Sequence, residues 1–286
     1  MAYWDWPASD PALSGHAVVC VHGLSRQGRD FDTLARALQP LGRVVCPDVA
    51  GRGQSDWLAD PMAYQVGTYA ADMVGLLVQL RQQGVHTVDW VGTSMGGLIG
   101  IALASQPSLA LRRLVLNDVG PVIQPEALLR IGSYLGANPL FATQHEAADY
   151  LWRISSGFGP HGPAQWLDLS LPMLVPDPAD GGSAAGWRLH YDPAIAQPFK
   201  ALTADLAGAA ARDGEAALWA MYDLITAPTL LLRGGSSDLL LPSTAAAMTQ
   251  RGPQARVVEF AGVGHAPTLV ADDQVQVVMR FLEERS

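Results

Sequence analysis

The segment Gly92-Thr93-Ser94-Met95-Gly96-Gly97 follows an apolar run at residues 87–91 and precedes a run with helical spacing. This order of strand, tight turn and helix is the context in which a Gly-x-Ser-x-Gly motif projects a serine above the edge of a sheet. Gly92 and Gly96 lack the Cβ atoms that would collide with the adjoining strand and helix. The motif therefore predicts Ser94 as a nucleophile at the end of a buried strand.

Apolar runs and helical runs alternate along much of the remaining chain. We expect strands at residues 17–21, 43–49, 87–91, 114–119, 229–233 and 256–260, and helices at residues 31–38, 69–80, 95–105 and 272–284. Near-continuous apolar strands that alternate with helices are typical of a parallel sheet covered on both faces. The fold class predicted is therefore α/β.

The region between about residues 120 and 225 interrupts this rhythm. It is rich in proline, glycine and aromatic residues and shows no clear alternation of strands and helices. A region of this length is too long for a structureless loop in a compact domain. We therefore expect a core formed by residues 1–119 and 226–286, and a mostly helical cap formed by residues 120–225.

A serine nucleophile needs a base, and the base needs a group that orients it. His265 lies in a glycine-containing loop after the last predicted strand, which places it at the same sheet edge as Ser94. Asp238 follows the strand at 229–233, so the chain order of the three candidates is Ser, Asp, His. We predict Asp238 as the orienting carboxylate, with Asp118 at the end of the strand after Ser94 as the alternative.

The negative charge that develops on a substrate oxygen needs backbone N–H donors. His22-Gly23-Leu24 follows the first core strand, and Gly23 allows its backbone to approach the site. We predict the N–H groups of Leu24 and Met95 as the oxyanion hole. His22 is interpreted as a structural imidazole within this loop.

Taken together, these motifs resemble the α/β-hydrolase superfamily, of the carboxylesterase and meta-cleavage-product hydrolase type. The resemblance spans residues 16–270 and rests on His22-Gly23-Leu24, Gly51-Arg52-Gly53-Gln54-Ser55-Asp56, Gly92-Thr93-Ser94-Met95-Gly96-Gly97, Gly235 with Asp238, and Gly264-His265. It implies an eight-stranded, mostly parallel sheet with helices on both faces and a helical cap inserted after the strand ending near Val119. It also implies that the turn at residues 51–56 is structural.

The function expected is a serine hydrolase that cleaves carboxylic esters of small to medium apolar substrates through an acyl-enzyme, without cofactor or metal. Cap aromatics such as Trp152 and Trp187 are candidates for contacts to the substrate. One alternative keeps the same triad but cleaves C–C bonds of meta-cleavage products, or lactones. It would need a basic cap residue, for which Arg153, Arg188 and Lys200 are candidates. A non-catalytic ligand-binding protein on the same fold is the third alternative.

Composition limits the partners that this chain can bind. Its 286 residues carry a formal charge of −9 and Lys200 is the only lysine, so the basic surface that nucleic acids require is missing. The uncharged stretch at residues 90–111 contains several glycines and polar residues, which favours a buried strand and helix over a membrane span. Cys20 and Cys46 are interpreted as buried thiols on neighbouring strands. We expect a cytoplasmic protein, and the sequence leaves its oligomeric state open.

Overall fold

The computed structural model describes residues 1–178, 184–201 and 204–284. Its main sheet has seven strands in the spatial order β1-β3-β2-β4-β5-β8-β9. The strands are β1 (Tyr3–Trp6), β2 (His16–Val21), β3 (Arg43–Pro47), β4 (Thr87–Thr93), β5 (Arg113–Asn117), β8 (Thr229–Gly234) and β9 (Arg256–Phe260). All neighbouring pairs are parallel except β1 with β3. The α/β class and all six predicted strands are confirmed, with ends shifted by up to two residues.

The resemblance implied eight strands, whereas seven form the main sheet within the described residues. The additional strand that the sequence analysis did not predict is β1, an antiparallel edge strand beside β3. On β1, Asp5 forms an ion pair with Arg43 of β3, and Trp4 and Trp6 pack against the core. Four residues are too few for periodicity to identify a strand, which explains why β1 was missed.

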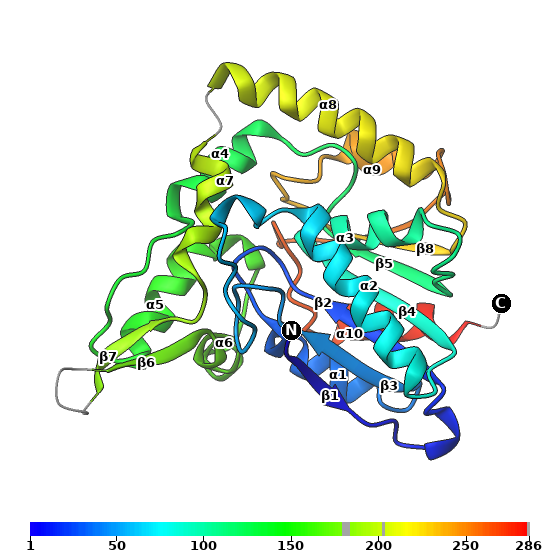
Figure 1. Ribbon diagram of the computed structural model, residues 1–286, viewed down its shortest axis with the longest axis horizontal. Helices are drawn as coiled ribbons and strands as arrows, with labels where there is room; N and C mark the ends of the chain where they lie inside the picture. Colours follow the sequence, from blue (N-terminus) through cyan, green and yellow to red (C-terminus); the bar gives the residue numbers. More distant parts are fainter. Residues whose placement is uncertain (179–183, 202–203, 285–286) are drawn as a thin grey trace.

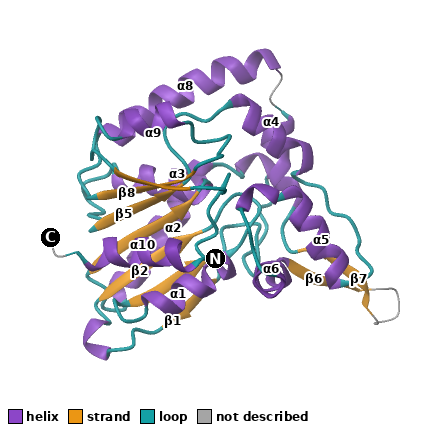
Figure 2. Cartoon of the chain, turned by 180° about the vertical axis from the view of Figure 1, so that it is seen from behind, coloured by secondary structure: helices purple, strands orange, loops and turns teal. Residues whose placement is uncertain are grey.

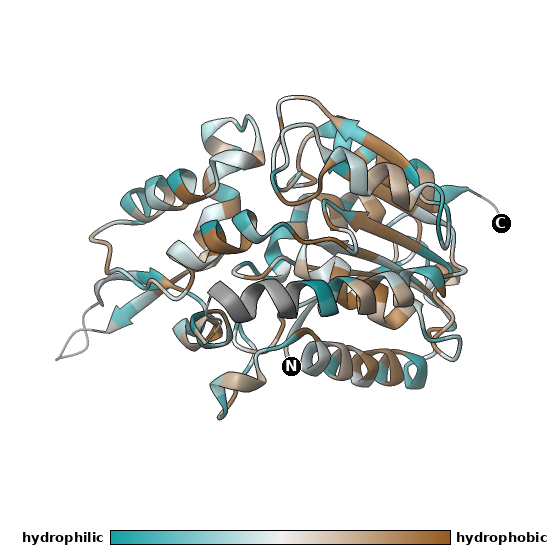
Figure 3. Cartoon of the chain, turned by 90° about the horizontal axis from the view of Figure 1, so that it is seen from above, coloured by the Kyte–Doolittle hydropathy of each residue, from teal (hydrophilic) through white to brown (hydrophobic). Residues whose placement is uncertain are grey.

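Helices cover both faces of the sheet. Helices α1 (Asp32–Leu38) and α10 (Asp272–Glu283) contact each other on one face, and α2 (Val66–Gln82) and α3 (Met95–Ala104) contact each other on the other face (Figures 1 and 2). Each face has its own core of buried apolar residues. The hydropathy colouring shows hydrophobic residues along the strands of the sheet and mixed colouring on the helices (Figure 3). The four predicted helices are confirmed.

Most of the segment between β5 and β8, called the cap below (residues 120–225), lies beyond one end of the sheet, while its last helix, α8, runs back along the core and contacts α3 (Figure 1). It contains α4 (Pro125–Tyr134), α5 (Gln144–Ile154), α6 (Pro163–Ser170), α7 (Gln197–Lys200), α8 (Ala204–Asp223) and the antiparallel hairpin of β6 (Leu174–Pro178) and β7 (Ala184–Leu189). The helices agree with the mostly helical cap that was expected, and the hairpin is an element that the sequence analysis did not predict. Helix α9 (Pro242–Met248) and six short 3-10 helices complete the described elements: Pro11–Leu13, Gly28–Phe31, Pro61–Ala63, Ser156–Phe158, Leu171–Met173 and Pro193–Ala196.

Two further expectations concern burial. Cys20 on β2 and Cys46 on the neighbouring β3 are fully buried free thiols, as predicted. Across the described ranges, no helix combines the length and the apolar character needed to cross a membrane.

Candidate active site

The parallel strands end at the same edge of the sheet, and this edge carries the predicted site. His22 follows β2, Ser94 follows β4, Asp118 follows β5, and His265 lies in the loop after β9. Because adjacent parallel strands bring their carboxyl ends together, residues far apart in the chain become neighbours at this edge. Nε2 of His265 lies 3.0 Å from Oγ of Ser94. The predicted convergence of these two side chains is therefore present in the geometry.

Ser94 occupies a sharp turn between β4 and α3. Its backbone has φ of 51° and ψ of −115°, a conformation that L-residues rarely adopt. A Cβ atom on Gly96 would lie 2.0 Å from the carbonyl oxygen of Val21, and one on Gly92 would lie 2.3 Å from the carbonyl oxygen of Gly96. The two glycines are thus required because the turn is packed directly against the neighbouring strand and helix.

Replacing Gly96 with alanine should destabilise the fold strongly. The added methyl would collide with backbone that cannot move aside, and overpacking of this kind costs about 1–3 kcal/mol or more. Gly75, which is exposed within α2 and whose added Cβ would meet nothing within 4 Å, is the matched control. Gly75→Ala should instead stabilise by about 0.4–1 kcal/mol. Chemical denaturation of both variants tests this, and similar unfolding free energies would contradict it.

Asp118, the alternative acid, is the carboxylate beside His265. Its Oδ2 lies 2.7 Å from Nδ1 of His265 and accepts a hydrogen bond of 2.6 Å from Oγ of Ser237. Its Oδ1 accepts from the N–H of Gly234 at 2.8 Å. Asp118 is fully buried, so these three partners together satisfy a charge that burial would otherwise disfavour. The contact between Asp118 and Nδ1 also orients the imidazole of His265 so that its Nε2 faces Ser94.

The prediction of Asp238 as the orienting carboxylate is corrected by the same geometry. Asp238 is about half exposed, and its two oxygens accept hydrogen bonds of 2.6 and 2.9 Å from Arg130 on α4. Partial burial raises the pKa of Asp238, but the hydrogen bond and charge of Arg130 outweigh this and lower the pKa overall. The turn after β8 directs Ser237 toward Asp118, whereas Asp238 faces the cap.

The predicted oxyanion donors lie on either side of Ser94. A Cβ atom on Gly23 would lie 3.7 Å from Cβ of Ser94, so the loop that carries Leu24 packs directly against the serine turn. Met95 is the first residue of α3. Neither the Leu24 nor the Met95 N–H has an acceptor among the described residues. Both amides are therefore free to donate to a substrate oxygen.

Arg52 supports both of these donors, although the sequence analysis assigned the turn at residues 51–56 no chemistry. Nε of Arg52 donates to the carbonyl oxygen of Leu24 at 2.8 Å, and Nη2 lies 3.8 Å from Sδ of Met95. Nη1 donates to Ala50 and to the hydroxyl of Tyr69. Arg52 is fully buried, so it acts as an internal brace that holds the loop of Leu24 in place.

His22 is a structural imidazole, as interpreted from the sequence. Nδ1 lies 2.7 Å from the carbonyl oxygen of Gly23, and Nε2 accepts from the N–H of Val49 at 3.0 Å. Burial lowers the pKa of His22 to about 3, because it disfavours the imidazolium form; the positive charges of Arg52 and Arg26 lower it further, and the bond to Gly23 opposes the shift. The ring is therefore neutral at physiological pH and is fully engaged in hydrogen bonds.

This depressed pKa makes the fold sensitive to acid. The unfolded state has the ordinary histidine pKa near 6.5, so His22 stabilises the fold fully above that pH and loses this contribution as the pH falls toward 3. The slope should approach about 1.4 kcal/mol per pH unit in this window. His22→Gln, whose amide can replace both hydrogen bonds, should remove that slope. Urea titrations at several pH values measure the difference, and equal slopes would refute it.

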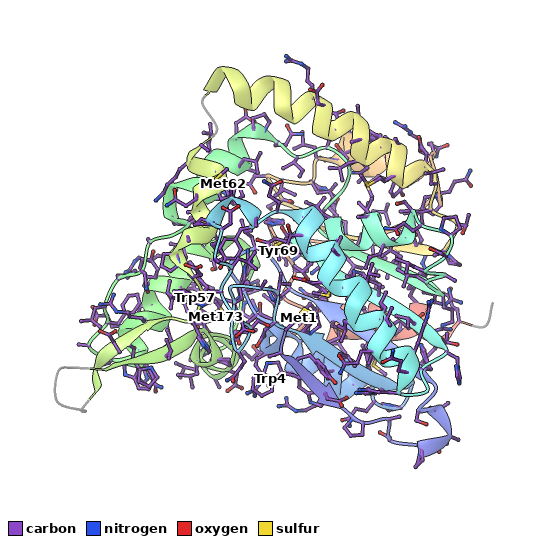
Figure 4. All side chains as sticks on the ribbon, viewed as in Figure 1. Met1, Trp4, Trp57, Met62, Tyr69 and Met173 are labelled. Atoms are coloured by element: carbon purple, nitrogen blue, oxygen red, sulfur yellow. The ribbon has the colours of Figure 1, made fainter. Side chains whose placement is uncertain are left out.

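A cavity beside Ser94 and His265 is lined from both the core and the cap. Its apolar lining comes mainly from the cap, and it includes Leu151, Ile154, Phe158, Leu169 and Met173. Figure 4 shows Met173 where the cap meets the rest of the molecule (Figure 4). The cavity is therefore suited to an apolar group held next to the serine.

The candidate substrate contacts Trp152 and Trp187 lie elsewhere. Trp152 packs against the rings of Trp166 and His161, and Trp187 pairs its backbone with Phe141. Neither is among the residues that line the cavity. Tyr134, Phe158 and Tyr191 are the cap aromatics that do line it, and their positions depend on helix packing that one sequence does not reveal.

The cap cations proposed for a C–C hydrolase are also missing from the lining of this cavity. Arg188 pairs with Asp177 and donates to the carbonyl oxygen of Asn138, and the guanidinium of Arg153 lies over the ring of Tyr150. Together with Lys200 they are absent from the lining residues. The arginines that line the cavity are Arg26 and Arg130, neither of which was predicted.

Sequence comparison agrees with the fold. The model of the Alpha/beta hydrolase family matches residues 18–278. The chain belongs to this family.

Relatives cover nearly the whole chain. A 3-hydroxybutyrate-oligomer hydrolase from Cupriavidus necator is 49% identical over 281 residues, which are 98% of this chain and 92% of that protein. The crystal structure of an alpha/beta hydrolase from Novosphingobium aromaticivorans is 35% identical, with a TM-score of 0.80 and 98% coverage of each chain. A putative hydrolase from Rickettsia typhi is 28% identical, with a TM-score of 0.83 and coverage of 99% of this chain and 91% of that one.

Proposed function

We propose that the protein is a serine hydrolase that cleaves carboxylic esters through an acyl-enzyme, with Ser94 as nucleophile, His265 as base and Asp118 as the carboxylate that orients the base. The observation that carries this proposal is the continuous chain of contacts from Ser94 Oγ through the imidazole to Asp118 Oδ2, at 3.0 and 2.7 Å. These distances fit proton transfer between a nucleophile and an oriented base.

The reaction follows from these positions. Nε2 of His265 takes the proton of Ser94 as Oγ bonds to the acyl carbon, and the N–H groups of Leu24 and Met95 bind the resulting oxyanion. The imidazolium then gives its proton to the leaving alkoxide as the ester C–O bond breaks. Water repeats the attack on the acyl-enzyme, with His265 again as base, and releases the acid and free Ser94. Asp118 stabilises the transient imidazolium without accepting its proton.

We further propose that the substrates are short oligomers of hydroxy acids, with 3-hydroxybutyrate oligomers as the first candidates. The relative from Cupriavidus necator supports this, since it matches nearly end to end at 49% identity. The apolar cap residues around the cavity support it as well, because such oligomers carry methyl groups along an ester backbone. The division into a core (residues 1–119 and 226–286) and a cap (residues 120–225) belongs to the same proposal, with the cap selecting the substrate.

The C–C hydrolase and lactonase alternatives use the same three side chains. The structure offers them less support, because the cap cations suggested for a second carboxylate form other contacts and do not line the cavity. Activity on a ring-fission diketo acid that exceeded activity on the ester oligomers would favour them over the ester proposal.

A labelling and turnover experiment tests the proposed function. Wild type should react with a fluorophosphonate probe at Ser94 and should release 3-hydroxybutyrate from its dimer and trimer, whereas Ser94→Ala should take up no label. Mass spectrometry of the labelled peptide and chromatography of the products measure the two results. An unlabelled wild type would instead support a non-catalytic binding protein on this fold. Labelling of Ser94 without release of 3-hydroxybutyrate would reject these oligomers as substrates and would leave the proposal of a serine hydrolase standing.

A further inference from the structure

The cavity beside Ser94 contains one buried cation that the ester mechanism leaves without a role. Arg26 and Arg130 both line it. The Arg130 side chain is 40% exposed and uses Nε and Nη2 to hold Asp238. Arg26 is only 7% exposed, so its charge lies in surroundings from which water is largely excluded.

The hydrogen bonds of Arg26 leave one edge of its guanidinium unused. Nε and Nη2 donate to the two oxygens of Asp30, each at 2.7 Å, and Nη2 also donates to the carbonyl oxygen of Leu169 at 2.9 Å. Nη1 is buried and has no acceptor among the described residues. A guanidinium has five N–H donors, and buried polar groups nearly always find partners, so the two unused hydrogens on Nη1 point to a ligand.

The position of Arg26 relates this unused edge to the reacting groups. The N–H of Arg26 donates to the carbonyl oxygen of Gly23 at 3.1 Å, which closes the turn that carries Leu24. The guanidinium lies 5.7 Å from the centre of the Phe158 ring, in the cap. Arg26 therefore extends from the oxyanion loop to the cap wall of the cavity that contains Ser94 and His265.

We propose that Nη1 of Arg26 binds a free carboxylate of the substrate, so that the enzyme selects esters whose leaving hydroxy acid ends in an ionised carboxyl group. In a linear hydroxy-acid oligomer the free carboxylate belongs to the terminal unit, whose hydroxyl oxygen is the leaving oxygen of the last ester bond. Cleavage then releases single hydroxy-acid units from the carboxyl end of an oligomer. The inference rests on the proposed ester hydrolysis and specifies which esters are favoured.

The neighbouring carboxylate does not prevent this binding. Asp30 occupies the Nε and Nη2 edge, and the two hydrogens of Nη1 keep no partner among the described residues. Burial raises the pKa of Asp30, although the charge of Arg26 opposes the shift, so its negative charge is held less firmly than that of a surface aspartate. A carboxylate is also the natural partner for a buried guanidinium, whose charge a neutral carbonyl would leave less well compensated.

The test compares the 3-hydroxybutyrate dimer with its methyl ester, which has the same scissile bond and lacks the anionic end. Wild type should show a kcat/KM for the free acid about 100-fold above that for the methyl ester, as expected for a hydrogen bond to a charged group. The double variant Arg26→Gln with Asp30→Asn removes the cation without leaving its buried counter-ion unpaired. In this variant the ratio should fall to near one, mainly through a higher KM for the acid.

The matched control is Arg29→Gln with Asp32→Asn, a second Arg–Asp pair on the neighbouring turn that does not line this cavity. It should keep the wild-type ratio. Circular dichroism checks the folding of both double variants. An unchanged ratio in the Arg26 variant, or an equal loss on both substrates, would overturn the carboxylate assignment while leaving the ester proposal intact. Hydrolysis of neither substrate, nor of the neutral p-nitrophenyl butyrate, would reject the ester proposal itself.

Discussion

Ser94→Ala should lower kcat for ester hydrolysis about 10⁶-fold, because no other side chain can form the acyl-enzyme once Oγ is removed. The substitution removes one oxygen from a residue with positive φ, and the packing around the turn depends on Gly92 and Gly96 instead. The fold should therefore survive. Initial rates on p-nitrophenyl butyrate and on the 3-hydroxybutyrate dimer measure the loss.

Ser105→Ala is the matched control for this prediction. Ser105 caps the other end of the same helix, where its hydroxyl donates to the carbonyl oxygen of Ala102. It should retain wild-type rates. A Ser94→Ala enzyme that keeps more than about one thousandth of the wild-type kcat would contradict the covalent mechanism. Without the nucleophile, the oxyanion donors and substrate binding leave an acceleration of only about 10³- to 10⁴-fold over the uncatalysed reaction.

The sequence predicts the elements of the sheet wherever a strand is buried on both faces. Strands β2, β4, β5 and β8 are almost entirely buried, so each appears as a continuous apolar run. The cap hairpin was missed for the opposite reason. Its first strand, Leu174–Pro178, contains two prolines, which usually argue against a strand.

The sequence predicts the site residues that directly follow a strand of the parallel sheet, because the end of the strand fixes their place at the sheet edge. Ser94 and His265 follow from strand ends and their glycines. The acid depends instead on how a turn directs its side chains, and the turn after β8 brings Ser237, not Asp238, to the site. Asp118 has a backbone φ of 56° at the end of β5, so no sequence period indicates where its carboxylate points. Its place directly after a strand adjacent to β4 was the available signal.

Cavity contacts were the least predictable feature. Arg26 and Asp30 lie four residues apart beside the oxyanion loop, and as a sequence pattern they resemble an ordinary surface pair. The cap places the carbonyl oxygen of Leu169 on Nη2 of Arg26, and Nη1 is buried without a partner among the described residues. The role of such residues depends on contacts between segments that are distant in the chain, and the spacing of residues along the sequence does not reveal these contacts.

Asp118→Asn should lower kcat about 10⁴-fold, whereas Asp238→Asn should leave it within about threefold. An amide at Asp118 would present N–H hydrogens where Oδ2 now accepts from Nδ1 of His265. The imidazole would then place its own hydrogen on Nε2 and could no longer take the proton of Ser94. Asp238→Asn removes only a half-exposed ion pair with Arg130, which contributes about 0–1 kcal/mol.

The two aspartate variants also distinguish catalysis from folding. The N–H of Gly234 can still donate to the side-chain oxygen of an asparagine at 118, and Oγ of Ser237 can accept from its NH2 group, so the fold should persist and the loss should appear in kcat more than in KM. Single-turnover kinetics with p-nitrophenyl butyrate would show slowed acylation in Asp118→Asn alone. A severe loss in Asp238→Asn, with Asp118→Asn near wild type, would restore Asp238 as the acid and require the loop after β8 to rearrange in the working enzyme.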